Sequence, residues 1–453
     1  MTEKRKRERV LIIGAAGRDF HNFNTVYRED DRYEVVAFTA TQIPEINDRE
    51  YPSELSGSLY PAGIPIGPME DLEKMIKAYQ VDTCVFSYSD IHYVDLMHIG
   101  NRVVSSGADF KILSPVRGHI PCKKPLVSIL AVRTGCGKSQ TTRRVVDILK
   151  NELGVEKVVS IRHPMPYGDL AKQAVQRYAE LDDLKKHKCT IEEMEEYEPH
   201  IQAGNVIYAG VDYGAILDQA QEEADVVLWD GGNNDPSFYK SDLTITIADP
   251  LRPGHELLYW AGESNLTMAD VIIINKCDSA KQEDIDLVIK NIKSRNPKAV
   301  IIKADSPVSV DDESLVRGKR VLVVEDGPTL THGEMNIGAG YVACERLGAA
   351  EIVDPRPFAV GSIAEAYKKY PQLGKVVPAL GYFGQQLEDL KETIAKADVD
   401  TVVIGTPIDL RRVIEIDQPS TRVQYDLAEH DTKALVEAIR KGLKIKSLSH
   451  TSA

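Results

Sequence analysis

The strongest constraint on this chain is a strand, a glycine turn and a helix in succession between residues 126 and 150, LVSILAVRTGCGKSQTTRRVVDILK. The apolar run over 126–132 predicts a buried strand, and the periodic apolar residues after the turn predict a helix. Between them, Gly135 and Gly137 precede Lys138 and Ser139. In this context Gly-Lys-Ser is typical of a phosphate-binding loop, because the glycines let backbone amides at a helix start approach an anion. The segment therefore predicts a nucleoside triphosphate site.

Each position of the turn has an expected role. We expect nucleotide contacts from seven consecutive residues: Thr134, Gly135, Cys136, Gly137, Lys138, Ser139 and Gln140. Lys138 is expected to act in catalysis at a terminal phosphate, and the Ser139 hydroxyl can bind Mg²⁺. Val132 stands where the strict pattern has glycine, and the turn is similar to variant loops of the dethiobiotin synthetase and MinD-like branch of P-loop proteins. That resemblance implies a second basic residue early in the loop, Arg133, which we expect to act in catalysis.

Two later strand ends extend the predicted site. The apolar run over 225–229 ends in Asp230, which is the Walker B pattern, and we expect Asp230 to act in catalysis by binding Mg²⁺ together with Ser139. The next motif, Asn275, Lys276 and Asp278, has the NKxD spacing and predicts contacts to the nucleotide base. The motif does not decide whether the nucleotide is ATP or GTP.

Residues 1–121 alternate between strand-like and helical segments and predict a Rossmann-like domain with a parallel sheet. The first strand ends in Gly14, Gly17, Arg18 and His21, without the GxGxxG pattern. Because no acid follows the second strand, a dinucleotide oxidoreductase is disfavoured. We expect these four residues to face the phosphate loop and bind the acceptor substrate. The alternative is a purely structural turn.

The remaining chain is predicted to form a P-loop NTPase domain over 125–318 and a C-terminal α/β region over 319–453, which can continue the P-loop sheet. Polar residues after strands predict further substrate contacts, because ligands of α/β proteins bind at the carboxyl ends of strands. These candidates are Arg252, His255, Asp326, Thr329, Thr331 and His332. Solvated or structural loops are the alternatives.

Composition excludes several classes of protein. Acidic residues outnumber basic ones by 69 to 55, which disfavours nucleic-acid binding, and no apolar run is long enough to cross a membrane. The six cysteines show no CxxC pair and are typical of free thiols in a reducing cytoplasm. We therefore expect a cytoplasmic α/β protein that acts on a small molecule.

The motifs together resemble one family. GAAGRDFHNF, AVRTGCGKSQTTR, IRHPMPYGDL, WDGGNND, DPLRPGHE, NKCD and VEDGPTLTHG are similar to those of the cyclic 2,3-diphosphoglycerate synthetase family, also catalogued as predicted GTPases. The resemblance covers nearly the whole chain. It implies a homodimeric enzyme that uses a nucleoside triphosphate and Mg²⁺ to close a phosphoanhydride within a small phosphorylated acid. The alternative from another class is a regulatory or chaperone-like GTPase that works as a conformational switch.

Overall fold

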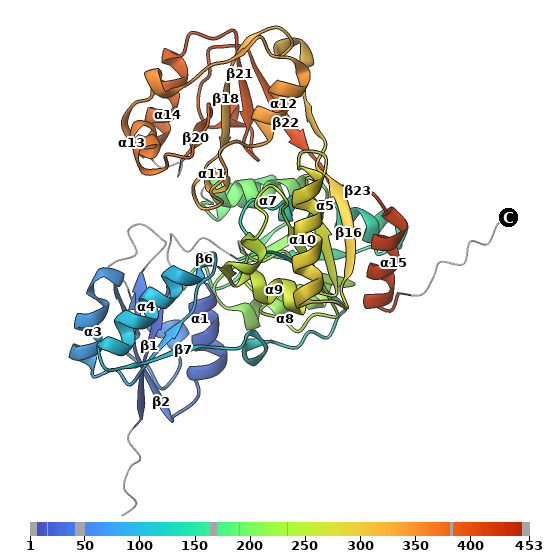
Figure 1. Ribbon diagram of the computed structural model, residues 1–453. Coiled ribbons are helices and arrows are strands. Elements are labelled where there is room, and N and C mark those ends of the chain that lie inside the picture. Colours follow the sequence, from blue (N-terminus) through green and yellow to red (C-terminus); the bar gives the residue numbers. More distant parts are fainter. Residues whose placement is uncertain are drawn as a thin grey trace, which may run out of the picture.

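The computed structural model describes residues 7–15, 17–40, 50–163, 170–189, 191–232, 234–380 and 384–445. Its strands form three large sheets, and each sheet with its helices makes one domain. Figure 1 shows the N-terminal domain in blue at the lower left, the middle domain in green and yellow, and the C-terminal domain in orange above. The α/β class with parallel sheets that the sequence predicts is confirmed.

The N-terminal domain is built on a six-stranded sheet with the order β3-β4-β2-β1-β5-β7. Its strands are β1 (Glu8–Ile13), β2 (Tyr33–Ala40), β3 (Glu50–Tyr51), β4 (Ile64–Pro68), β5 (Thr83–Phe86) and β7 (Asp109–Ile112). Its helices are α1 (Arg18–Asn22), α2 (Ser53–Ser56), α3 (Leu72–Tyr79) and α4 (Tyr93–Ser105). All pairings are parallel except that of the edge strand β3 with β4. β1 lies near the centre because its last four residues are apolar and fully buried.

The middle domain has a nine-stranded sheet with the order β10-β11-β9-β12-β8-β13-β15-β16-β23. Its strands are β8 (Leu126–Ala131), β9 (Val158–Ile161), β10 (Gln176–Tyr178), β11 (Val206–Ala209), β12 (Val226–Trp229), β13 (Leu243–Ala248), β15 (Val271–Ile274), β16 (Val300–Asp305) and β23 (Ala428–Glu429). Its helices are α5 (Lys138–Asp147), α6 (Leu181–Lys186), α7 (Ile191–Gln202), α8 (Tyr213–Glu223), α9 (Gly262–Met268), α10 (Gln282–Arg295) and α15 (Thr432–Gly442).

The strand order of this sheet brings the predicted motifs together. β8 is completely buried and lies between β12 and β13, with parallel pairing to both. The phosphate loop follows β8, Asp230 follows β12, and the NKxD motif follows β15. Because parallel strands end at one edge of a sheet, all three motifs gather at the same edge.

The C-terminal domain has its own sheet, with the path β17-β22-β21-β18-β19 and β20 paired to β18. Its strands are β17 (Val308–Val310), β18 (Arg320–Asp326), β19 (Glu351–Ile352), β20 (Val377–Ala379), β21 (Thr401–Gly405) and β22 (Ser420–Tyr425). Its helices are α11 (Gly327–Thr331), α12 (Ala339–Leu347), α13 (Gly361–Lys369) and α14 (Gly384–Lys396). The chain then returns, because β23 pairs with β16 and α15 packs on the middle domain (Figure 1). The C-terminal region thus adds one strand to the P-loop sheet and forms a separate sheet with the rest.

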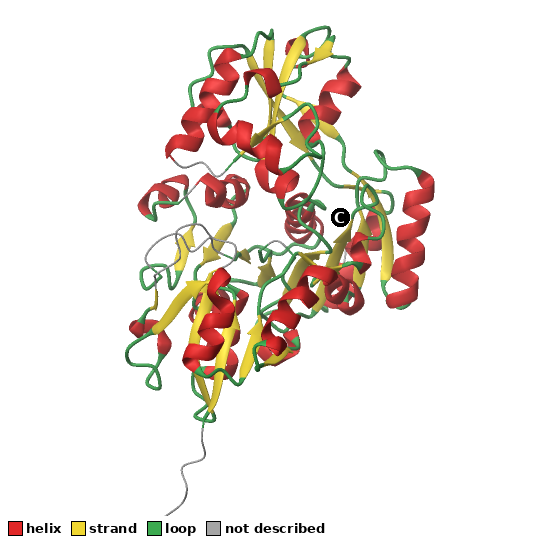
Figure 2. Ribbon diagram, turned by 60° about the vertical axis from the view of Figure 1, so that its left-hand side comes forward, coloured by secondary structure: helices red, strands yellow, loops and turns green. Residues whose placement is uncertain are grey.

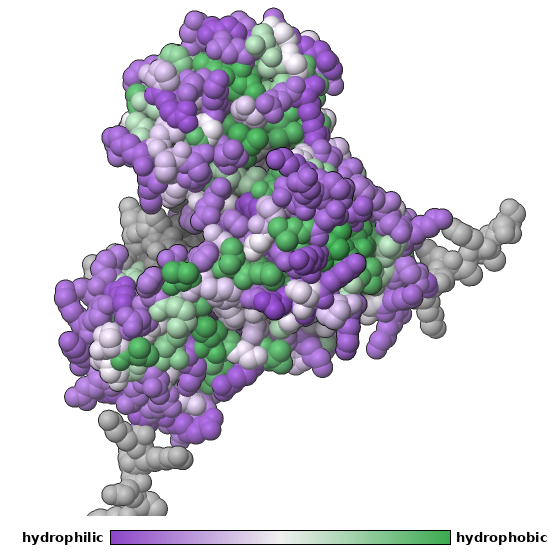
Figure 3. All heavy atoms as spheres, in the orientation of Figure 1, coloured by the Kyte–Doolittle hydropathy of each residue, from purple (hydrophilic) through white to green (hydrophobic). Residues whose placement is uncertain are grey.

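A short antiparallel pair links the first two domains, formed by β6 (Ile91–His92) and β14 (Tyr259–Trp260). Figure 2 shows the three yellow sheets, with the C-terminal domain above and the other two below. Figure 3 shows a mainly hydrophilic face on which hydrophobic residues form separate groups. Within the described ranges, no helix combines the length and apolar character needed to cross a bilayer.

Candidate active site

A large cavity, with a volume of about 510 Å³, lies between the middle and C-terminal domains. The phosphate loop and the NKxD motif line one side, and the ends of β18 and β21 with the start of α12 line the other. Parallel strands of two sheets therefore direct their carboxyl ends into one space, which is where α/β proteins bind ligands. The cavity is large enough for a nucleotide and a small second substrate.

The NKxD motif binds the backbone of the phosphate loop. The loop backbone takes left-handed conformations at Gly135, with φ 79°, and Gly137, with φ 103°. The Asn275 amide donates to the Cys136 carbonyl at 2.9 Å, and Lys276 Nζ donates to the Gly135 carbonyl at 2.6 Å. A side chain at Gly137 would also collide with Asn275. Because loop carbonyls are turned toward Asn275 and Lys276, loop amides remain for a phosphate.

Lys138 lines the phosphate end of the cavity, and it is paired with Asp230, which is fully buried and does not line the cavity. Lys138 Nζ donates to Asp230 Oδ1 at 3.1 Å and to the Asp230 carbonyl. The other carboxylate oxygen, Oδ2, contacts Arg162 and lies 3.0 Å from His200 Nε2. Thr142 donates its hydroxyl to Oδ1. Asp230 is thus fully buried among two cations and two further polar groups.

This cluster shifts the pKa of both central groups. Burial alone would raise the pKa of Asp230, but Arg162 and Lys138 outweigh burial and hold that pKa well below its usual range. Burial and the neighbouring Arg162 together lower the pKa of Lys138 to about 8, although Asp230 partly opposes the shift. Asp230 is therefore ionised at neutral pH, and Lys138 is a cation that a phosphate can reach.

The predicted base-contacting residue Asp278 is engaged by the C-terminal domain. Its Oδ1 accepts from the Ser306 amide at 3.0 Å, and its Oδ2 accepts from Arg346 Nη2 at 2.7 Å. Arg346 lies on α12 and also donates to Ser279. Asp278 and Arg346 both line the cavity, so the base end of the site is shared between two domains.

Arg133, predicted to be catalytic, contacts residues of all three domains. Its Nε donates to Asp90 of the N-terminal domain at 2.6 Å, and Nη2 donates to the His332 carbonyl of the C-terminal domain at 2.9 Å. Its Nη1 lies 2.7 Å from His255 Nδ1, and the guanidinium lies 3.5 Å from the Tyr259 ring centroid. Only 1% of the Arg133 surface is exposed, and Nε, Nη1 and Nη2 already have partners in the protein. Few of its N–H groups are therefore available to bind a phosphate in this arrangement.

Arg252, predicted to bind substrate, also makes a contact between domains, whereas His255, with the same predicted role, contacts Arg133 within the middle domain. Arg252 donates to Asp249 at 2.9 Å and to the Gly333 carbonyl, and it is buried. Burial and the adjacent Arg133 lower the pKa of His255 to about 4, so this histidine is neutral at pH 7. Neither residue lines the large cavity.

The predicted anion site at the first turn of the N-terminal domain is filled by a side chain of the chain itself. Asp19 Oδ1 accepts from the amides of Gly17, at 2.8 Å, and Phe20, at 2.7 Å. At Gly14, where φ is 125°, a side chain would collide with the same carboxylate. Because the amides at the start of α1 already bind a carboxylate, this turn has lost the donors that an external phosphate would need.

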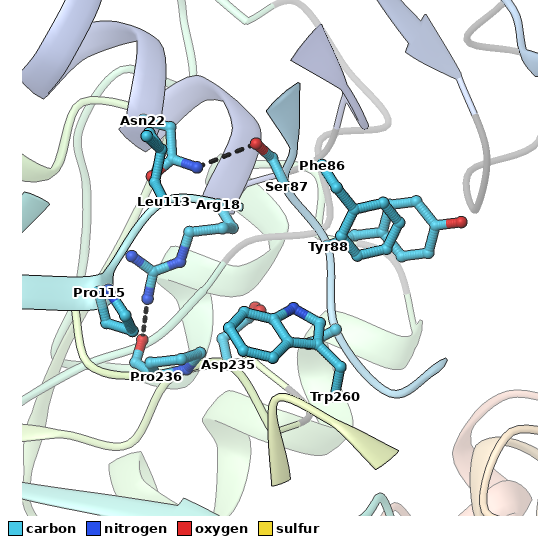
Figure 4. A pocket seen from close by; sticks show the side chains of 11 residues that line it. Arg18, Asn22, Phe86, Ser87, Tyr88, Leu113, Pro115, Asp235, Pro236 and Trp260 are labelled. Atoms are coloured by element: carbon cyan, nitrogen blue, oxygen red, sulfur yellow. Dashed lines mark hydrogen bonds between the residues drawn. The ribbon is translucent and has the colours of Figure 1, made fainter. Parts of the chain in front are cut away.

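Arg18 and His21 pack against the segment that follows the Walker B strand. Arg18 Nη2 donates to the Pro236 carbonyl (Figure 4). The Arg18 guanidinium also lies 4.3 Å from the Phe238 ring centroid. The His21 ring stacks on Phe238 at 4.2 Å and lies 2.7 Å from the Gly118 carbonyl. Both residues are buried against the P-loop domain, at Pro236 and Phe238 and not at the phosphate loop. Arg18 lines a cavity of about 20 Å³ that holds at most one water.

The predicted loop after β18 divides into two groups. Asp326 and Thr329 line the cavity, and the Thr329 amide donates to Asp326 at 3.1 Å. Thr331 instead donates to the Gly327 carbonyl within α11, and His332 Nδ1 lies 3.2 Å from the Thr331 hydroxyl. The cavity wall formed by the C-terminal domain is therefore acidic, with Glu325 beside Asp326.

The structure brings to the site or its border four residues that are not among the predicted site residues: Asp90, Arg162, Glu325 and Arg346. Three of them follow or lie near strand ends, but their partners come from another domain or from distant loops. Arg346 does not follow a strand, because it lies in the last turn of helix α12. Residues 164–169, in the middle of the IRHPMPYGDL motif, and Asn233 of WDGGNND fall outside the described residues.

Comparison with known proteins identifies a close relative. Arginine synthetase ArcE from Thermococcus kodakarensis is 57% identical to this chain over 444 residues, which are 98% of each protein. No family model matches the chain. Among solved structures, LpxK from Aquifex aeolicus in complex with ATP has a TM-score of 0.43 at 10% identity, covering 82% of this chain and 99% of its own. A ParA family ATPase from Chlorobium tepidum has a TM-score of 0.24 at 14% identity, covering 42% and 86%. These two scores are too low to support an interpretation of the site.

Proposed function

Because the chain belongs to the same family as arginine synthetase ArcE, we propose that it is a nucleotide-dependent synthetase that forms the guanidinium group of arginine. Its phosphate loop supports the use of a nucleoside triphosphate. The observation that carries the proposal is the cavity, in which a phosphate loop with Lys138 faces an acidic wall formed by Glu325 and Asp326. One wall suits a triphosphate and the other suits cationic nitrogen groups.

The chemistry follows from the product. Arginine differs from citrulline, its ureido counterpart, by a nitrogen in place of an oxygen. A ureido oxygen is a poor leaving group, and transfer of the γ-phosphoryl group to that oxygen makes it a phosphate that can leave. A nitrogen nucleophile then attacks the ureido carbon, the new C–N bond forms, and the C–O bond to phosphate breaks. Nucleoside diphosphate, inorganic phosphate and arginine are the products.

The residues of the middle domain supply the phosphoryl-transfer step. Phosphoryl transfer depends mainly on positioning and on stabilisation of charge. Loop amides and Lys138 would bind the terminal phosphates. Ser139 lines the cavity, and Asp230 is a buried, ionised carboxylate at the same edge of the sheet. A hydroxyl and a carboxylate are oxygen ligands of the kind that would bind Mg²⁺. The Mg²⁺ ion would neutralise charge on the phosphates.

The acidic wall favours an amino acid and ammonium over a polyanion. Four residues predicted to bind 2,3-diphosphoglycerate lie outside the cavity in contacts within or between domains: Arg18, His21, Arg252 and His255. The wall of the cavity that the C-terminal domain forms carries the carboxyl groups of Glu325 and Asp326. Ammonium is the nitrogen donor that fits such a wall, because an anionic donor such as aspartate would be repelled. Closure of a ring in 2,3-diphosphoglycerate remains the second candidate, on the motifs of the sequence.

The test is a comparison of acceptors with the purified protein, ATP or GTP, and Mg²⁺. We expect citrulline with ammonium to increase release of the nucleoside diphosphate and to yield arginine by mass spectrometry. 2,3-Diphosphoglycerate should increase neither the release of nucleoside diphosphate nor the formation of arginine. Stimulation by 2,3-diphosphoglycerate, with a cyclic product, would favour the second candidate. Hydrolysis that no acceptor stimulates would favour a switch GTPase.

A further inference from the structure

Glu325 is the last buried residue of β18, and its carboxylate is enclosed by glycines. The Tyr341 amide donates to Oε1 at 2.8 Å, at the start of α12. A side chain at Gly338 or at Gly405 would stand 2.5 Å or 2.4 Å from Oε2. At both positions the missing side chain therefore makes room for one carboxylate oxygen.

The same two glycines, Gly338 and Gly405, line the large cavity together with Glu325. Glu325 lines the cavity although only 2% of its surface is exposed, and neither glycine places a side chain over Oε2. The phosphate loop lines the opposite side of the same cavity. A small group held near Glu325 would thus lie between the carboxylate and the transferred phosphoryl group.

We propose that Glu325 is the base that takes a proton from ammonium and so releases the ammonia that attacks the activated ureido carbon. This inference rests on the proposed arginine-forming reaction. The ammonium N–H proton moves to Oε2, and the nitrogen lone pair forms the C–N bond while the C–O bond to phosphate breaks. Phosphate takes the bonding electrons, and the proton on Glu325 then passes to solvent.

The electrostatics of Glu325 agree with this role. Burial raises the pKa of Glu325 to about 7, and the backbone amides of α12 only partly oppose that rise. A general base is most effective when its pKa lies near the working pH. Below pH 7 Glu325 is protonated and cannot accept a proton, so the ammonium-dependent rate should fall as the pH decreases through about 7.

The decisive variant is Glu325→Gln. Glutamine keeps the shape and can still accept the Tyr341 N–H, so a residue that only caps α12 would tolerate the change. We expect kcat with ammonium to fall about a hundredfold or more, the magnitude typical of a lost general base. The half-saturation for nucleotide should stay constant. Glu351→Gln is the control, because Glu351 lies in the same domain in an exposed pair with Arg320.

Hydroxylamine provides the second readout, because it is largely unprotonated at neutral pH and needs no base to become a nucleophile. Glu325→Gln should therefore retain most of its rate with hydroxylamine. An ammonium rate within threefold of the wild type, or an equal loss with both nucleophiles, would overturn the assignment of Glu325. Absence of arginine formation in the wild-type protein would instead overturn the proposed function, so the two failures can be told apart.

Discussion

At the scale of single residues, Lys138 is the group on which turnover depends most. It lines the cavity and donates to Asp230, while Arg162, His200 and Thr142 also contact that carboxylate. Loss of Lys138 therefore leaves Asp230 with other partners.

We predict that Lys138→Ala lowers kcat by about a hundredfold to a thousandfold, as for other groups that stabilise transition-state charge. The melting temperature should change by only a few degrees. The measurement is the rate of nucleoside diphosphate release beside a thermal unfolding curve. Turnover near that of the wild type would contradict the role of the phosphate loop.

At the scale of elements, the NKxD loop after β15 and helix α12 form the base end of the site. Asp278 is paired with Arg346, so its charge is already compensated and both of its oxygens have donors. Guanine recognition by an NKxD aspartate requires that the carboxylate accept hydrogen bonds from the base. Arg346 therefore competes with guanine for Asp278.

We predict that Arg346→Ala raises the ratio of kcat/KM for GTP to that for ATP about tenfold, the equivalent of about 1.4 kcal/mol. Asp278→Asn in the Arg346→Ala background should remove the gain. Arg317→Ala is the matched control, because Arg317 forms an exposed pair with Glu313. An unchanged ratio in Arg346→Ala would show that Arg346 does not select the base.

The elements also show what the sequence can predict. The strand, glycine turn and helix around Lys138, and the strand that ends at Asp230, are local patterns, and the structure contains both. The roles of Arg133 and Arg252 depend on Asp90 and Gly333, which lie in other domains, and local spacing does not reveal such partners. Gly338 and Gly405 lie in the same domain as Glu325 but at a distance in the sequence, so local spacing does not reveal them either.

At the scale of the whole molecule, the N-terminal domain is tied to the phosphate loop through Asp90. This carboxylate accepts from Arg133 and from the Thr134 hydroxyl, and its pair with Arg133 is almost completely buried. Removal of one partner from a buried pair leaves an uncompensated charge, which costs about 3–5 kcal/mol.

We predict that Asp90→Ala lowers the temperature of the first unfolding transition by several degrees in scanning calorimetry. Glu313→Ala, which breaks the exposed pair with Arg317, should cost at most about 1 kcal/mol and serves as control. Equal effects of the two substitutions would show that the Asp90–Arg133 pair does not hold the domains together.

The central claim is that the terminal phosphoryl group is transferred to the oxygen that nitrogen replaces. Citrulline labelled with ¹⁸O in its ureido group tests this directly, with ammonium, Mg²⁺ and the nucleotide in unlabelled water. We predict that the released inorganic phosphate carries one ¹⁸O per arginine formed, measured by the isotope shift in ³¹P NMR. Release of unlabelled phosphate would contradict the claim, whether it occurs at the rate of arginine formation or without any arginine formation.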